Sequence, residues 1–483
     1  MRGYLSRLPK TDLGFFSILF LYTIFIFRKA FSAHYFQDDF FFIKVSQVEN
    51  LKEFLYFFYP FKEYFFRPVA TEVFYYTLSL VNYNLLVGHL IVFGVLFTGL
   101  IFLFKSIFFL TKSKPFSYLV VFMYSISLTH VFQLYWFATF QEVCLFSFLT
   151  ISFYFFLKNR YLISLPFFLL ALLSKETAIF FPFVLIFYAY YRHKLELRKY
   201  FPVIFFFLIS AFFLLIYSAG VSSVEQIEIY KIQLNPKLIV NNISWYFLWS
   251  LGFPNFLPNY VKSIFLQPLP DFWNLMKADS IRTYMYFLSS YLVIFTSTLA
   301  FYLYINKGQS KRIIKLALVS FFFFLLFLSP TLPIIHKWMV RLTIPFIFLT
   351  IIQSYLIYLF YKSKNKVLSF LSLILVLSYS LFNILGVKVH ESSGLFELEN
   401  QTVINAQRIF FQRKDEIIEK GIIYFSEDDS QSWGGTKRLK NTLHNQDFIT
   451  YYFPNKPIKA IYGFENFKPP ENAVIIKAGE FFR

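Results

Sequence analysis

The apolar run LVGHLIVFGVLFTGLIFLFKS at residues 86–106 decides the fold class of this chain. About 20 consecutive apolar residues are enough for a helix to cross the hydrocarbon core of a membrane. The rest of the chain has the same character, because 57% of its 483 residues are hydrophobic and only 15% are charged. Such a chain cannot cover its apolar surface with polar groups, so we predict an integral membrane protein. A soluble enzyme, a disordered tail and a secreted disulfide scaffold are excluded, and the single cysteine, Cys144, excludes an internal disulfide and a cysteine-based zinc site.

Similar apolar segments recur along the chain and are candidate membrane spans. There are eleven of them, at 13–33, 86–106, 116–135, 141–157, 161–174, 176–191, 200–218, 284–305, 313–330, 342–361 and 367–386. We therefore expect an all-α polytopic membrane domain at residues 1–386, with about 11 transmembrane helices.

Lysine and arginine collect in the short segments between alternate spans, where they predict a cytoplasmic position. These segments are 1–12, 105–115, 158–160, 192–199, 307–315 and 362–366, and their only acids are Asp12 and Glu196. We expect a multi-pass protein of the plasma (inner) membrane with a cytoplasmic N-terminus. Because this orientation explains the net charge of +19, we expect no nucleic-acid partner. Residues 1–32 also imitate a secretory signal peptide, but Arg28 and Lys29 interrupt that pattern.

Three segments are too polar or too interrupted to span, and all three fall on the outer side: 34–85, 219–283 and 387–483. The first contains an amphipathic stretch at 51–58, which suits a helix at the membrane interface. The second combines tryptophans with prolines, which predicts short interfacial helices joined by turns. The third has helix-like spacing at 396–419 and strand-like runs at 421–425, 459–462 and 473–477. It predicts a small extracytoplasmic α/β domain at 387–483.

Asp38 and Asp39 lie among aromatic residues just outside the first expected span. Two adjacent carboxylates in apolar surroundings are costly to desolvate, so each should be paired or functional. On a helical turn their side chains point about 100° apart, so only one can face a reaction centre. The alternative is that one aspartate caps the following helix and the other is solvated.

Arg67 and the pair Lys175 and Glu176 lie close to outer span ends. Arg67, which precedes Pro68, could clamp a phosphate or brace an aspartate, or it could reach lipid headgroups. Lys175 and Glu176 could orient a phosphate or a carboxylate network, or they could pair with each other or with a neighbour.

The loop at 331–341 gathers His336, Lys337 and Arg341, which suit an anionic lipid headgroup, bound specifically or as a generic contact. A last polar group lies at the outer ends of the third and fourth spans and could complete a pocket; it consists of His130, Gln141 and Glu142.

Together these features resemble the GT-C superfamily of membrane glycosyltransferases, the polyprenyl-phosphate-sugar-dependent group that includes protein O-mannosyltransferases and aminoarabinose transferases. The similarity rests on three pieces in this order: Asp38-Asp39, Phe66-Arg67-Pro68-Val69, and Leu172-Leu173-Ser174-Lys175-Glu176-Thr177. Their order and spacing most resemble the tetratricopeptide-bearing O-mannosyltransferases. Here a short α/β tail stands where those proteins have their tetratricopeptide array, and the 331–341 region matches the family only loosely.

The resemblance implies an inverting hexosyl- or pentosyltransferase that moves a sugar from a polyprenyl-phosphate donor, held in membrane lipid, to a hydroxyl group of a glycan, lipid or protein. It implies that the acidic pair is catalytic, with Asp38 as general base. The other implied roles are the donor phosphate site (Lys175, Arg341, His336, Lys337) and a group that organises the acidic loop and contacts substrate (Arg67, Glu176, Glu142, His130). No cofactor is required for a monophosphate donor, although Asp39 and Glu176 leave room for a divalent metal ion.

Two other classes of function stay open. A lipid-sugar transporter or flippase usually carries charges and broken helices near the bilayer midplane, whereas here the candidate charges lie at outer span ends and glycine is scarce. A glycan ligase or polymerase with a diphosphate-linked donor would depend on a large outer loop rich in arginine and histidine rather than on an acidic first loop.

Overall fold

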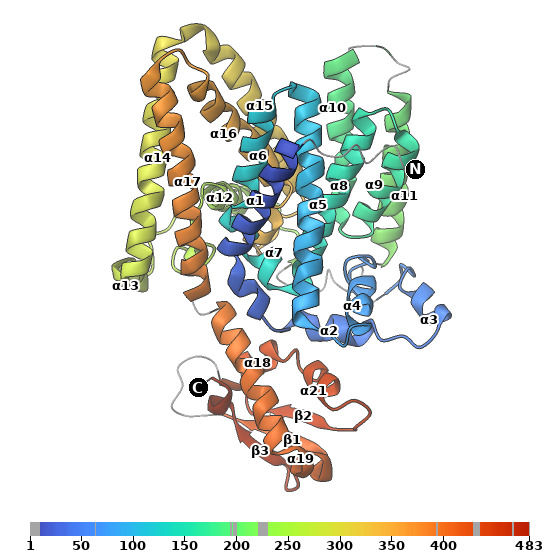
Figure 1. Cartoon of the computed structure of the whole chain (residues 1–483). Coiled ribbons are helices and arrows are strands. Elements are labelled where there is room, and N and C mark those ends of the chain that lie inside the picture. Colours follow the sequence, from blue (N-terminus) through green and yellow to red (C-terminus); the bar gives the residue numbers. More distant parts are fainter. Residues whose placement is uncertain are drawn as a thin grey trace.

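The computed structural model describes residues 10–62, 64–193, 196, 200–220, 230–392, 395–427, 435–465 and 468–482. A long helical body carries a small α/β unit at one end (Figure 1). Each of the eleven apolar segments overlaps a helix of the body, although the segment 116–135 is broken after Ser125. These helices are α1 (Lys10–Ile26), α5 (Leu85–Thr111), α6 (Lys114–Ser125), α8 (Phe140–Leu157), α9 (Tyr161–Leu172), α10 (Phe181–His193), α11 (Phe201–Gly220), α14 (Asp279–Ile305), α15 (Ser310–Leu328), α16 (Pro345–Tyr361) and α17 (Lys366–Ser392).

Some of these helices are long and apolar enough to cross a membrane. Among the described residues they number four, namely α5, α8 together with the preceding turn η3 (Phe137–Thr139), α14 and α17. A fifth results if α6 is counted as one span with the segment Leu128–Tyr135, formed by η2 (Leu128–His130) and α7 (Val131–Tyr135), from which it is bent by 48°. The protein is thus mainly helical, and its long apolar helices are compatible with insertion in a membrane.

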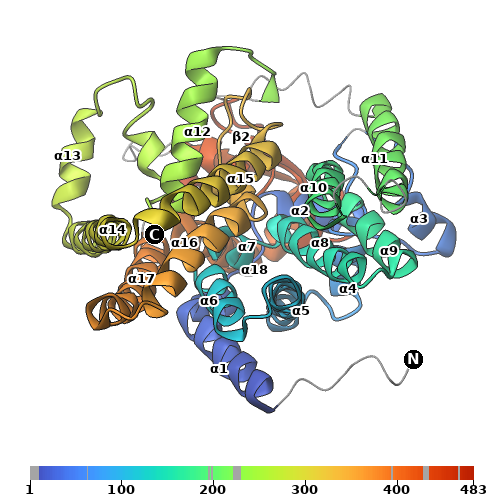
Figure 2. The same cartoon turned by 90° about the horizontal axis from the view of Figure 1, so that it is seen from above.

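The outer faces of the helices are apolar, as a lipid environment requires. Ile18 of α1, Leu215 of α11 and Leu318 of α15 are all well exposed. Continuous apolar surface of this kind is rare on soluble proteins. Seen from above, α14 and α17 lie on one side of the body and α9, α10 and α11 on the other, with α15 and α16 between them (Figure 2).

Inside the body, α5 and α8 approach closely at a glycine. A Cβ atom on Gly99 would lie 2.5 Å from the ring of Phe146, so no larger residue fits without displacing that ring. At the same level, the hydroxyl of Ser147 donates to the carbonyl oxygen of Val95 at 2.6 Å. A hydroxyl bonded to the neighbouring helix fixes the register of the two helices.

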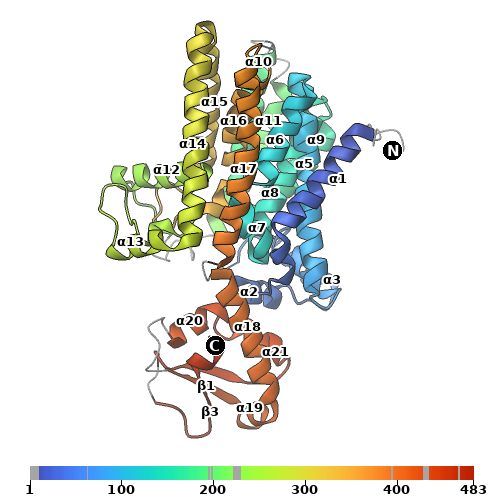
Figure 3. The same cartoon turned by 60° about the vertical axis from the view of Figure 1, so that its left-hand side comes forward.

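The first outer segment folds into three short helices at the end of the body that faces the α/β unit (Figures 1 and 3): α2 (Asp38–Val45), α3 (Leu51–Tyr56) and α4 (Glu72–Ser79). The helix α3 coincides with the amphipathic stretch expected at 51–58, and it exposes Leu51, Leu55 and Tyr56. Asn50 begins this helix by accepting a hydrogen bond from the backbone N–H of Glu53 at 3.0 Å.

The second outer segment contains α12 (Pro236–Ser250), the turn η8 (Leu257–Asn259) and α13 (Pro270–Lys277). Short helices joined by turns are what the sequence predicts here. Of the two, α13 exposes Trp273, whereas α12 buries Trp245 and Trp249 against the body. The tryptophans of α12 therefore pack on the body, whereas that of α13 is exposed.

The α/β unit consists of α18 (Leu395–Gln412), α19 (Lys414–Lys420), β1 (Ile422–Ser426), α20 (Gly435–Thr442), α21 (Asp447–Tyr452), β2 (Lys459–Tyr462), β3 (Val474–Lys477) and the turn η11 (Ala478–Phe481). Its three strands lie where the sequence predicts them. They form a parallel sheet in the order β2-β1-β3, with Ile423 opposite both Ala460 and Val474. The central strand is apolar along its middle because it is covered on both faces.

The boundary between the two parts differs from the expectation. α17 does not end before residue 387 but continues to Ser392, since Val387, Val389 and His390 keep a buried helical face. The α/β unit therefore begins after this helix.

Candidate functional site

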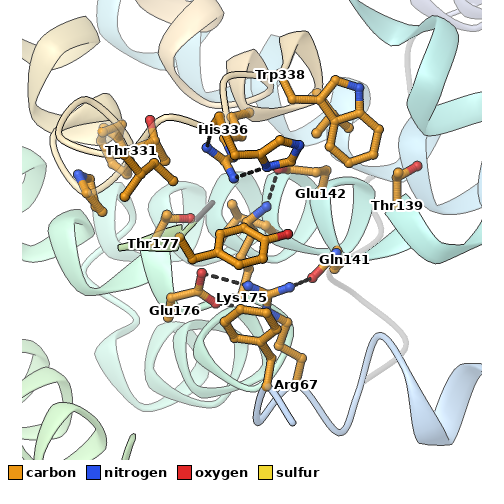
Figure 4. A pocket seen from close by; sticks show the side chains of 18 of the residues that line it. Arg67, Thr139, Gln141, Glu142, Lys175, Glu176, Thr177, Thr331, His336 and Trp338 are labelled. Atoms are coloured by element: carbon orange, nitrogen blue, oxygen red, sulfur yellow. Dashed lines mark hydrogen bonds and ion pairs between the residues drawn. The ribbon is translucent and has the colours of Figure 1, made fainter. Parts of the chain in front are cut away.

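A cavity of about 650 Å³ lies at the end of the body that carries the first outer segment. Seven of the ten site residues expected from the sequence line it, from five separate parts of the chain. They are Asp38 of α2, Arg67 between α3 and α4, Glu142 of α8, Lys175 and Glu176 at the start of η4 (Glu176–Phe180), and His336 and Arg341 around η10 (Met339–Leu342). Figure 4 shows most of these side chains converging on one space.

Asp38 faces this cavity, whereas Asp39 turns away from it. The chain enters α2 through Gln37, whose φ of 51° lies in the left-handed region and turns the helix start. The Asp39 side chain is fully buried, and its carboxylate accepts hydrogen bonds from the backbone N–H of Phe36 at 2.9 Å and from the hydroxyl of Tyr75. Asp39 thus ties the turn before α2 to α4, and its position does not support the expectation that it acts catalytically.

The two aspartates also differ in how far they are buried. Burial raises the pKa of Asp39 to about 8, against the opposing hydrogen bonds from Tyr75 and Phe36, so this carboxyl is mostly neutral at pH 7. The Asp38 side chain is 56% exposed to the cavity. The surrounding protein still excludes much bulk water, and this desolvation raises the pKa of Asp38. A carboxylate with a raised pKa is a better base than a free one.

Arg67 organises the next part of the wall. Its Nε and Nη2 donate to the two carboxylate oxygens of Glu176, both at 2.8 Å, and its Nη1 donates to Gln141 at 2.5 Å (Figure 4). The side chain is only 12% exposed and lies over the ring of Phe65. Arg67 therefore does not reach for lipid headgroups, and the carboxylate that it braces is Glu176 and not an aspartate.

This bridge joins two chain segments that carry the sequence signals. The backbone N–H of Val69 donates to the carbonyl oxygen of Leu173 at 3.1 Å, which ties the Arg67 segment to the turn before Lys175. A bidentate pair next to a backbone hydrogen bond fixes both position and orientation.

Lys175 pairs with Glu142 rather than with the adjacent Glu176. Both members of this pair are buried, and Figure 4 shows the ammonium group directed toward the α8 carboxylate. Removing either partner would leave an uncompensated buried charge. The pair therefore holds the start of α8 against the start of η4.

The 331–341 loop presents Arg341 and His336 as a unit. Arg341 donates to the carbonyl oxygen of His336 at 2.5 Å, and its second terminal nitrogen lies 3.1 Å from His336 Nδ1. Because a guanidinium only donates, Nδ1 must accept, and the ring proton resides on Nε2. Burial, with the charges of Arg341 and Lys337, lowers the pKa of His336 to about 4. At neutral pH His336 can therefore meet an anion as a neutral donor through Nε2.

Lys337, expected at the donor phosphate, does not line the cavity. The chain is extended at Trp338, and neighbouring side chains of extended backbone point to opposite sides. His336 and Trp338 consequently face the cavity while Lys337 points away from it.

The second outer segment holds this loop in place. Asn242 of α12 donates to the carbonyl oxygens of Leu332 at 2.9 Å and Ile334 at 2.8 Å. The backbone N–H of Gln233 donates to Pro333 at 2.7 Å. Sequence spacing gives no sign of these contacts, since they join segments distant in the chain.

His130 does not belong to the site. It is buried in the body, and its Nε2 lies 2.7 Å from the carbonyl oxygen of Tyr124. Its position does not support the expected substrate role, because it lies in the bend between α6 and α7 and is bonded within the body.

Asp39 and Glu176, which the sequence leaves as possible metal ligands, have other partners. Asp39 accepts a hydrogen bond from Tyr75, and Glu176 forms an ion pair with Arg67. Within the described part of the chain, no group of three or more His, Cys, Asp or Glu residues is placed to hold a metal ion.

Several lining residues were not expected from the sequence: Tyr217, Tyr230, Lys231 and Trp338. Trp338 could have been found from its position two residues after His336 in an extended stretch. Tyr230 and Lys231 lie in a stretch of sequence without hydrophobic periodicity, so the sequence offers no signal for them.

Comparisons with protein-family models, with curated proteins and with solved structures found no match to this chain.

Proposed function

We propose that this protein is an inverting membrane glycosyltransferase of the GT-C type, which moves a sugar from a polyprenyl-phosphate donor to a hydroxyl acceptor. One observation carries the proposal: Asp38, Arg67, Lys175 and Arg341, from four distant parts of the chain, line a single cavity. Three of these parts are the segments that resemble the GT-C enzymes. Residues that act together on one substrate must line the same cavity.

The charges of the cavity suit an anionic donor. The Arg67–Glu176 and Lys175–Glu142 pairs are each neutral overall. Arg341 has no carboxylate within 4 Å among the described residues, and its guanidinium lines the cavity beside the neutral His336. An arginine in this state can form charge-assisted hydrogen bonds to a phosphate without first breaking an ion pair.

Asp38 is the general base of the proposed reaction. It takes the proton of the acceptor hydroxyl while the hydroxyl oxygen attacks the anomeric carbon. The bond from that carbon to the phosphate oxygen breaks, and its electron pair leaves with the polyprenyl phosphate. Attack opposite the leaving group inverts the anomeric carbon, and Arg341 stabilises the charge that grows on the phosphate.

The remaining wall suits the lipid part of the donor. Leu145, Phe327 and Ile344 supply apolar surface beside the charged residues. A donor with its tail in the bilayer and its phosphate at the end of the helical body fits both surfaces. A monophosphate leaving group met by arginine requires no cofactor, so we propose none.

We also propose that all eleven apolar helices embed in the plasma (inner) membrane, with the N-terminus in the cytoplasm and the cavity and α/β domain outside. The turns with the expected cytoplasmic lysines and arginines, after α5, α14 and α16, lie at the end of the body opposite the α/β unit (Figure 1). This arrangement supports the orientation, because basic short loops stay inside.

The test is cleavage of radiolabelled polyprenyl-phosphate hexoses and pentoses by the purified protein in proteoliposomes, with glycan, lipid or protein acceptors supplied outside. We expect a new glycoside with inverted anomeric configuration. Movement of the intact donor across the bilayer without cleavage would instead identify a transporter or flippase. Cleavage restricted to diphosphate-linked donors would identify a ligase or polymerase.

A further inference from the structure

The α/β unit does more than follow the membrane domain, because it contacts the helix that carries Asp38. The backbone N–H of Gln37 donates to the carbonyl oxygen of Thr442 at 2.8 Å, and Lys44 forms an ion pair with Asp447 at 2.8 Å. α2 thus lies between the helical body and the α/β unit, as Figure 3 shows.

Three side chains across this contact form a line that ends at Asp38. His444 Nδ1 lies 2.8 Å from the Oδ2 atom of Asp447, and His444 Nε2 lies 3.8 Å from the Oδ1 atom of Asp38. Because the carboxylate of Asp447 accepts, Nδ1 carries the proton of the neutral ring. The lone pair on Nε2 is then directed at Asp38, the same logic by which a buried carboxylate orients an imidazole toward a reacting group.

The groups around His444 keep Asp447 ionised. Although burial opposes it, the hydrogen bonds from His444 and Lys44 hold the pKa of Asp447 below its usual range. The ring of Phe41 lies 5.7 Å from the imidazole and covers one side. The charged groups that face the imidazole are therefore Asp38 from α2 and Asp447 from α21, with Lys44 bound to the latter.

The backbone is held in an unfavourable conformation on both sides of this contact. His444 has a φ of 48° and Gln37 a φ of 51°, values that residues other than glycine rarely adopt. Such a conformation is strained and persists where surrounding contacts determine it, often at functional sites. Gln37 directly precedes Asp38, and His444 is its partner in the contact. The two backbone conformations therefore help to set the position of the imidazole relative to the carboxylate.

We propose that His444 of the α/β unit is a positioning residue for Asp38 and the exit route for the proton that Asp38 collects. This inference rests on the proposed sugar transfer. After the acceptor hydroxyl has given its proton to Asp38, the protonated carboxyl donates that proton to His444 Nε2. The imidazolium is stabilised by Asp447 and releases the proton to bulk water, since the His444 side chain is 31% exposed.

The distance of 3.8 Å exceeds a hydrogen bond by about 0.6–1 Å, and catalytic contacts often shorten only when substrate is bound. No oxidant or further reactant is needed, since the electron pair of the broken bond leaves with the polyprenyl phosphate.

The activity test compares His444→Gly with the matched control Asn445→Gly. Both residues have positive φ, so glycine keeps the backbone at each site, but only the first change removes an imidazole next to Asp38. We expect His444→Gly to lose about 10²-fold in kcat, the lower end of the range for acid–base groups, with an unchanged KM for the donor. Free imidazole should restore much of this loss, while Asn445→Gly stays near wild type. Full kcat in His444→Gly, or a loss that imidazole does not restore, would overturn the inference.

A second measurement needs no turnover. The chain has seven histidines, and NMR of ¹⁵N-histidine-labelled protein can follow the ring resonances of His444, assigned by their absence in His444→Gly. Asp38→Asn changes the group that lies 3.8 Å from Nε2 and should shift the Nε2 resonance of His444. An unchanged Nε2 resonance would refute the contact. If the resonance shifts but the wild-type protein cleaves no polyprenyl-phosphate sugar, the proposed function fails and the contact stands.

Discussion

The 331–341 loop should lose stability in acid through a single residue, His336. The pKa of His336 is lowered to about 4, firstly by burial and then by Arg341 and Lys337, whereas an unfolded histidine titrates near 6.5. Between these values the unfolded chain binds a proton that the folded loop does not. Folding stability is therefore complete above about pH 6.5 and is lost as the pH falls toward 4.

The size of the effect follows from the shift. One pKa unit corresponds to about 1.4 kcal/mol, so the wild-type protein should lose about 3 kcal/mol through His336 between pH 7 and pH 4. His336→Gln removes this titration while keeping an oxygen that can accept from Arg341. The other buried histidines remain in both proteins, and their contributions cancel in the comparison.

The assay is thermal unfolding of both purified proteins in detergent across this pH range. We expect the wild-type unfolding temperature to fall faster in acid than that of His336→Gln, with the gap opening below about pH 6.5. Parallel curves would show that His336 is not held neutral, and the assignment of its ring proton to Nε2 would be wrong.

Further predictions concern the charged wall of the cavity. Arg341→Ala should raise the donor KM about 10–100-fold, because it removes a charge-assisted hydrogen bond worth about 1.5–3 kcal/mol. Lys337→Ala is the control and should leave the donor KM unchanged, because the Lys337 side chain does not line the cavity. Equal donor KM values in the two variants would refute this phosphate site. Arg67→Ala and Glu176→Gln should each destabilise the protein by about 3 kcal/mol in denaturation assays, and the double variant should cost much less than their sum; simple additivity would rule out the bridge as a stabilising unit. Chelation of divalent ions with EDTA should leave sugar transfer unchanged, and a loss restored by added metal would contradict a cofactor-free mechanism.

Apolar runs along the chain located the long helices of the body, and short apolar runs located the three strands, whereas α2, α4, α20 and α21 were not predicted. The reason is physical: a long buried or lipid-facing helix and a central strand need continuous apolar sequence, while short helices in polar segments do not. Seven of the ten expected site residues also line one cavity. Charged groups at the ends of apolar helices avoid lipid, so they face the interior of the helix bundle or a water-filled cavity.

The sequence did not predict which charged side chains pair with each other. Lys175 binds Glu142 instead of its neighbour Glu176, and Arg67 binds Glu176 instead of an aspartate. These choices depend on which helices pack together, a property that local spacing does not encode. His444 is the clearest case, since its contact with Asp38 joins opposite ends of the chain through a left-handed turn.

The central claim is that the Asp38 carboxylate activates the acceptor hydroxyl. The most direct test is Asp38→Asn in proteoliposomes, with binding of a radiolabelled polyprenyl-phosphate sugar and its transfer measured on the same sample. The account predicts that the donor still binds, because Arg341 is intact, and that transfer falls about 10²–10⁴-fold. Transfer at the wild-type rate with an intact fold would contradict it.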